Sequence, residues 1–238
     1  MKCKNCDTDL TSKYCPNCGQ PNELKRIDGH YIIHEIEHVL HFERGILYTI
    51  RELITNPGQN VKNYLNENRT RLVKPIIFIV VTSLIYSLCS HFFHFQDGYV
   101  SYLDSTKSTT SEIFKWIQGH LGYSNIIIGL FIALWTKLFF GKYKYNIFEI
   151  LILLCFVIGM GMLIYSVFGI LQGITHFNLM QFAGIVGLIY TTWAVGQFYD
   201  KRKVSSYFKA FFAYILGMLT FALAVIIVGT LTDLIIKH

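Results

Sequence analysis

The chain has 238 residues, of which 53% are hydrophobic and only 15% are charged, whereas soluble domains typically carry about 25% charged residues. Its net charge is +6, but the basic residues stand beside long apolar runs, which favours contact with lipid headgroups and argues against a nucleic-acid-binding protein. Residues 1–74 hold 11 of the 21 Lys and Arg residues. The composition therefore predicts a polar N-terminal region followed by a membrane domain.

Four cysteines near the N-terminus form two C-x-x-C pairs separated by eight residues: Cys3, Cys6, Cys15 and Cys18. Four thiolates supply the closed tetrahedral shell of a structural zinc site. Pro16 and Asn17, inside the second pair, favour the turn that such a pair needs. The spacing predicts a zinc ribbon over residues 1–20 that holds one structural zinc ion in a reducing compartment. We expect it to dock a cytoplasmic protein partner or to stabilise the fold.

Residues 21–74 are predicted to form a linker and amphipathic helices, cytoplasmic or at the membrane interface. In the first helix, four histidines share one stripe at 100° per residue: His30, His34, His38 and His41. Three interpretations stay open for this stripe. It is a polar face bonded to protein or headgroups, a non-catalytic metal site, or part of a metal-dependent membrane hydrolase. In the hydrolase, His34 and His38 of H-E-x-x-H would bind zinc and Glu35 would act as the base. We favour the first, since no third ligand for a catalytic metal is identifiable.

Five later segments are apolar over about the 20 residues that a bilayer crossing requires. They cover about 76–95, 124–140, 147–172, 179–199 and 207–234. Between the first two, the outer loop 96–123 is predicted to contain a short amphipathic helix that opens at Ser111-Glu112 and lies on the outer surface. Small residues such as Ala213 and Gly217, or Gly169 and Gly173, are expected at helix contacts. The sequence therefore predicts an all-α integral membrane protein with about five transmembrane helices, over residues 75–238, and a zinc ribbon.

The orientation follows from the distribution of basic residues between the spans. Nine lie on one side: Lys62, Arg69, Arg71, Lys74, Lys142, Lys144, Lys201, Arg202 and Lys203. The other side has three: Lys107, Lys115 and Lys237. This asymmetry predicts a cytoplasmic N-terminus and an outward-facing C-terminus.

Polar residues within or beside the spans are candidates for function. Lys137 and Glu149 flank a predicted cytoplasmic turn, where snorkelling to the interface is the simplest interpretation. Several uncharged polar residues of the spans could line a polar pocket: Gln172, Gln181, Gln197, Thr191 and Thr192. Such a pocket would suit a carrier of a small molecule or lipid.

The ribbon ending at residues 14–20, the His-rich helix and the segment 42–78 together resemble bacterial membrane proteins catalogued as domain of unknown function 3667. The more specific part is Asn56-Pro57-Gly58 followed by Tyr64, Arg69, Arg71, Lys74 and Pro75. The resemblance implies a bacterial membrane protein of this architecture and assigns no activity. We expect a non-enzymatic inner-membrane protein. The alternatives are a metal-dependent hydrolase using His34, Glu35 and His38, and a small-molecule or lipid carrier.

Overall fold

The structure is a computed structural model, and it describes residues 2, 8–9, 15–17, 45–69, 71–93 and 108–236. The chain divides into two compact units, Met1–Glu43 and Arg44–His238. In the first unit, Lys2 and Asp9 form an isolated antiparallel bridge, and a turn follows Cys15, which is buried. All the helices described below belong to the second unit.

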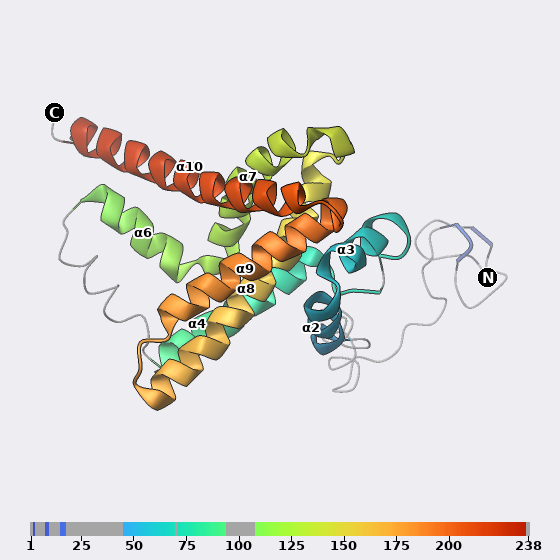
Figure 1. Ribbon diagram of the computed structural model, residues 1–238, viewed down its shortest axis with the longest axis horizontal. Coiled ribbons are helices and arrows are strands. Elements are labelled where there is room, and N and C mark those ends of the chain that lie inside the picture. The colour runs from blue at the N-terminus through green and yellow to red at the C-terminus, as the bar shows by residue number, and fades with distance from the viewer. Residues whose placement is uncertain are drawn as a thin grey trace. The chain divides into compact units, whose positions relative to one another are not determined.

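The second unit is built from helices, in agreement with the predicted all-α fold (Figure 1). In chain order they are α2 (Ile46–Thr55), α3 (Pro57–Asn66), α4 (Pro75–Phe93), α6 (Thr109–Gly119), α7 (Leu121–Phe139), the short 3-10 helix η2 (Gly141–Tyr143), α8 (Ile147–Thr175), α9 (Met180–Asp200) and α10 (Val204–Ile236). The five predicted apolar segments correspond to α4, α7, α8, α9 and α10.

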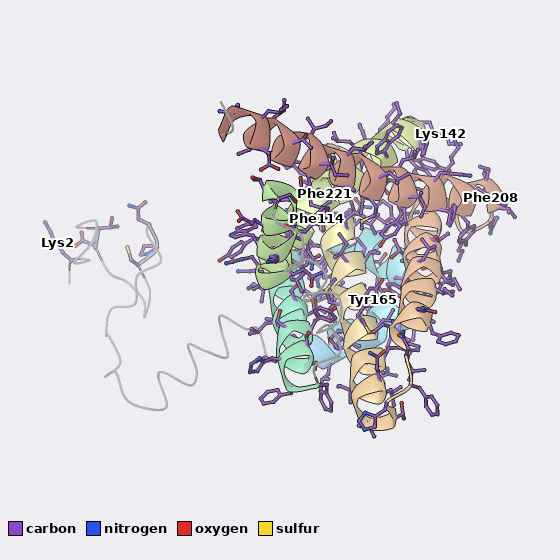
Figure 2. All side chains as sticks on the ribbon, turned by 90° about the vertical axis from the view of Figure 1, so that its left-hand side faces the viewer. Lys2, Phe114, Lys142, Tyr165, Phe208 and Phe221 are labelled. Atoms are coloured by element: carbon purple, nitrogen blue, oxygen red, sulfur yellow. The ribbon has the colours of Figure 1, made fainter. Side chains whose placement is uncertain are left out.

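Helices α4, α8 and α9 lie side by side, and α10 runs across this bundle instead of along it (Figures 1 and 2). Helix α7 packs against both α8 and α10, and α3 packs on α9. The centre of the bundle is filled by large, fully buried side chains, among them Phe78, Leu153, Phe156 and Phe198. Apolar side chains also cover much of the outer surface, as expected where lipid replaces water.

Three helical segments within the described residues are long and apolar enough to cross a membrane: Pro75–Phe93, Ile147–Thr175 and Val204–Ile235. A fourth crossing exists if α6 and α7, between which the chain bends by 107°, count as one broken span. Helix α9 has the length of a span, but polar residues such as Gln181, Thr191 and Gln197 lower its hydropathy. A membrane domain is therefore shown, with three or four crossings by length and composition where the sequence predicted five.

Small residues allow the close helix contacts that the sequence predicted. A Cβ atom on Gly217 would lie 2.6 Å from the Ile132 Cα, so α10 and α7 approach backbone to backbone. A Cβ atom on Gly173 would lie 2.5 Å from the Phe93 ring, where α8 meets α4. In lipid no hydrophobic force drives helices together, so close van der Waals packing of this kind contributes to their association.

The helix in the loop between the first two spans begins two residues before the predicted position. Ser108 is its N-cap, and the Ser111 backbone N–H donates to the Ser108 hydroxyl at 3.2 Å. Asp233 of α10 accepts the Thr109 backbone N–H at 3.2 Å and also the Thr109 hydroxyl proton. Helix α6 is thus anchored on the C-terminal part of α10, whereas the sequence predicted a helix lying on the outer surface.

Candidate functional site

The segment that the sequence marked as most specific, Asn56-Pro57-Gly58, joins α2 to α3. Asn56 leaves helical geometry (φ −145°, ψ 65°), and Pro57 follows as the first residue of α3, where its missing N–H needs no partner. The Asn60 side-chain amide donates to the Glu52 carbonyl at 2.7 Å, which links α3 to the last turn of α2. Residues 46–66 thereby form a tight helical hairpin, called here the α2–α3 hairpin.

Gly58 places the α2–α3 hairpin directly on the backbone of α9. A Cβ atom at this position would lie 2.5 Å from the Gln197 carbonyl carbon and 2.8 Å from the Phe198 Cα, with the Phe198 nitrogen nearer still. The Gly58 N–H donates to the Gln197 side-chain oxygen at 2.8 Å, so an otherwise unpaired N–H of the first turn of α3 is satisfied by α9. Glycine is required here because of the close approach.

Further hydrogen bonds hold α2 in place. The Tyr190 hydroxyl of α9 donates to the Leu53 carbonyl at 3.1 Å, and Leu53 itself is buried. The Val73 N–H donates to the buried Thr49 hydroxyl at 3.1 Å, which ties the loop before α4 to α2. Arg71 also pairs with Glu52 at 2.9 Å, but this exposed ion pair contributes little.

Aromatic side chains fill the space beneath the hairpin. The Tyr64 ring meets the Phe156 ring edge-on at 5.4 Å between centroids, and Phe140 stacks on Tyr199 at 3.8 Å. Tyr145, in the turn before α8, lies 4.7 Å from the Phe198 ring. Burial raises the pKa of the Tyr64 hydroxyl, while the nearby charge of Arg69 opposes this shift. The cluster packs the hairpin against α8 and α9.

Cationic residues from three separate segments meet around Asp200, at the end of α9. The Lys62 amine of α3 donates to the Tyr199 carbonyl at 3.5 Å, and the Lys203 amine pairs with Asp200 at 2.8 Å. Desolvation lowers the pKa of Lys62, and the repulsion from Lys201 adds to this, while the attraction of Asp200 opposes it. The pKa of Asp200 is lowered, first by the hydrogen bonds from Lys203 and from the Arg202 N–H. The positive charge of Lys142, between α7 and α8, lowers it further. These are the segments that the charge distribution assigned to one side.

The predicted metal-site residues lie mostly outside the described residues. These are Cys3, Cys6 and Cys18 of the ribbon and, from the histidine stripe, His30, His34, Glu35, His38 and His41. Cys15 is described and is buried. Within the described part of the chain no three His, Cys, Asp or Glu side chains are grouped to hold a metal. The zinc site and the histidine stripe therefore stay predictions.

Two of the residues proposed for a polar pocket, Gln172 and Gln197, make their hydrogen bonds near opposite ends of α9. Gln197 bonds to Gly58 at the end of α9, whereas the Gln172 oxygen accepts the Leu179 and Met180 N–H groups at the start of α9, at 2.8 and 3.1 Å. Gln197 thus accepts an N–H of the first turn of α3, and Gln172 accepts N–H groups at the start of α9. Thr192 lines a different, apolar groove.

The charged residues at the turn between α7 and α8 have structural roles. The Glu149 side chain accepts the Asn146 N–H at 2.7 Å, and the Asn146 side chain accepts the Glu149 N–H at 2.9 Å, a capping box for α8. The Lys137 amine donates to the Tyr145 carbonyl. These bonds fix the turn between α7 and α8.

Two polar contacts between the spans were not predicted. The Asn125 amide of α7 donates to the Ser83 hydroxyl of α4 at 3.0 Å, with both side chains buried. The Lys209 amine of α10 donates to the Phe139 carbonyl at 3.3 Å, at the end of α7. The sequence could have indicated the first contact, because Asn125 lies inside an apolar run and such an amide needs a partner on another helix in lipid.

Comparison with known proteins gives one match. Residues 43–87 match the family model described as Protein of unknown function (DUF3667). That segment comprises α2, α3 and the first part of α4, so it contains the α2–α3 hairpin and Gly58. No curated protein and no solved structure matches the chain.

Proposed function

We propose that this chain, which matches the DUF3667 family model over residues 43–87, is a non-enzymatic bacterial inner-membrane protein whose N-terminal zinc ribbon binds a cytoplasmic protein partner. The observation that carries the proposal is the close approach of Gly58 to the α9 backbone, together with its hydrogen bond to Gln197. Residues 1–43 precede the α2–α3 hairpin in the same chain, and this hairpin is fixed on α9 of the membrane domain. A partner bound by the ribbon would thereby be held at the membrane.

The proposed topology has five crossings, a cytoplasmic N-terminus and an outward-facing C-terminus. The meeting of Lys62, Lys142 and Lys203 around Asp200 supports one cytoplasmic side for α3, the turn before α8 and the turn before α10. The contact between Asp233 and Thr109 supports one shared side for the C-terminus and the outer loop. Helix α10 has 33 residues, so it is long enough to cross the bilayer at a large tilt.

Metal analysis of the purified full-length protein tests the zinc ribbon. We expect one zinc ion per chain, and we expect Cys15→Ser to lose it because three ligands hold the metal far less well. The membrane helices should still insert, since each satisfies its own backbone hydrogen bonds. Two zinc ions per chain would assign a second site to the histidine stripe, and no zinc in the wild-type protein would refute the ribbon.

A photocrosslinking residue at position 12, inside the predicted ribbon, tests the partner in living cells. We expect one crosslinked cytoplasmic protein with the wild-type sequence, and none with Cys15→Ser at equal expression. Glu35→Gln is the matched control, because it removes the base that a hydrolase needs while preserving shape and hydrogen bonding. It should leave the crosslink and the cellular role unchanged. If Glu35→Gln abolished complementation of a deletion strain while zinc content and expression stayed normal, the hydrolase would replace this proposal.

A further inference from the structure

A groove of about 310 Å³ lies between α9 and the N-terminal part of α10. Its walls are Thr192 from α9 and four aromatic residues from α10: Tyr207, Phe208, Phe211 and Phe212. The volume falls at the lower end of the range of small-ligand sites, about 300–1,000 Å³. Figure 2 shows Phe208 near the end of α10 that adjoins α9. The groove is apolar, so it suits a hydrocarbon occupant.

Packing of its walls makes the groove a built feature of the fold. The Tyr207 hydroxyl donates to the Lys201 carbonyl at 3.1 Å, which fixes this ring against the turn between α9 and α10. The same ring covers Gly196, where a Cβ atom would lie 2.5 Å from it. Phe208 and Phe212 are 62% and 52% exposed, so the groove opens on an apolar surface of the kind that faces lipid tails. An occupant can therefore enter from the bilayer.

The turn between α9 and α10, to which Tyr207 of the groove is bonded, is rich in basic residues. Residues Lys201, Arg202 and Lys203 are all exposed. Lys203 is paired with Asp200 at 2.8 Å. The Arg202 backbone N–H also donates to the Asp200 carboxylate at 3.1 Å, while among the described residues the side chains of Lys201 and Arg202 form no ion pair. The turn thus carries three basic residues against one acidic residue, and basic residues at a membrane surface attract anionic headgroups.

We propose that the groove binds one anionic phospholipid, with an acyl chain between α9 and α10 and the phosphate held by Lys201 and Arg202. This goes beyond the proposed function, since it does not depend on the zinc ribbon. A zwitterionic lipid offers the same chains but no net negative charge, so the two cations favour the anionic lipid. A peptide helix fits less well, because a groove of this volume accommodates a chain rather than a helix of 10–12 Å diameter.

Native mass spectrometry of the full-length protein in detergent, with defined amounts of phosphatidylglycerol or phosphatidylcholine, tests this site. We expect one tightly retained phosphatidylglycerol per chain and much weaker retention of phosphatidylcholine. The double variant Lys201→Gln with Arg202→Gln should weaken phosphatidylglycerol binding by about 30-fold, from the usual contribution of two basic residues near an anionic headgroup. The matched control is Arg69→Gln with Lys74→Gln, which removes the same charge before α4 and should leave binding unchanged.

The variant Thr192→Phe tests the acyl-chain part, because the added ring occupies the groove without altering charge. It should reduce retention of both lipids, and its thermal unfolding should report an intact fold. Equal retention of the two lipids by the wild-type protein would overturn the proposal. So would an equal loss in the Arg69 and Lys74 control, because the charges would then act without a defined site. If the Lys201 and Arg202 variant kept wild-type binding, the phosphate assignment would be wrong.

Discussion

Gly58→Ala is the change that most directly tests the seat of the α2–α3 hairpin. The new Cβ atom would lie 2.5 Å from the Gln197 carbonyl carbon, whereas ordinary contacts begin at 3.4 Å. Because the opposing atoms are backbone atoms of α9, no side-chain rotation relieves the overlap. Helix α3 must therefore move away from α9 by about 1 Å, which also breaks the 2.8 Å hydrogen bond to Gln197.

The size of the effect follows from three contributions. Overpacking typically costs about 1–3 kcal/mol, and a lost hydrogen bond costs about 1 kcal/mol more. Alanine recovers about 1 kcal/mol through its higher helix propensity. The packing of α3 on α9 should therefore weaken by about 1–3 kcal/mol. For α3 amides that exchange through local opening, this corresponds to about 5- to 150-fold faster hydrogen exchange.

Hydrogen–deuterium exchange with mass spectrometry on the purified protein measures this directly. Gly161→Ala in α8 is the matched control, because a Cβ atom there meets nothing within 4 Å, and its exchange should equal that of the wild-type protein. Gln197→Met keeps the backbone fit and removes only the acceptor, so it should give a smaller increase in α3. Wild-type exchange in Gly58→Ala would show that the hairpin is not held by this contact, and the reasoning above would be wrong.

Three further predictions concern the membrane domain. Asp233→Ala removes the acceptor of the Thr109 N–H, so exchange in α6 should rise by the equivalent of about 0.5–2 kcal/mol, and unchanged α6 exchange would refute this anchor. Gly217→Ala should lower the thermal unfolding temperature, because its Cβ would lie 2.6 Å from the α7 backbone, and an unchanged temperature would contradict that contact. Reporter fusions should place residue 203 in the cytoplasm and residue 238 outside, whereas a C-terminal fusion active only in the cytoplasm would remove one proposed crossing.

The sequence by itself determined where the helices of the membrane domain lie. Runs of about 20 apolar residues predict helices, because a backbone in lipid must satisfy its hydrogen bonds within its own segment. All five predicted segments are helical, and α8 begins at the predicted residue 147. The family resemblance was likewise carried by local residues, and the match over 43–87 supports the part of it that rests on residues 42–78. The cysteine and histidine predictions stay untested, since most of those residues lie outside the described ones.

Only the tertiary structure decided how these helices meet. Gly58 is 139 residues from Gln197, and Thr109 is 124 residues from Asp233, so neither pairing leaves a periodic signal in the sequence. The steep crossing of α10 over the bundle was not predicted either. An apolar run specifies burial in lipid on every side of a helix, whereas the crossing geometry depends on which small and polar residues of distant segments fit together.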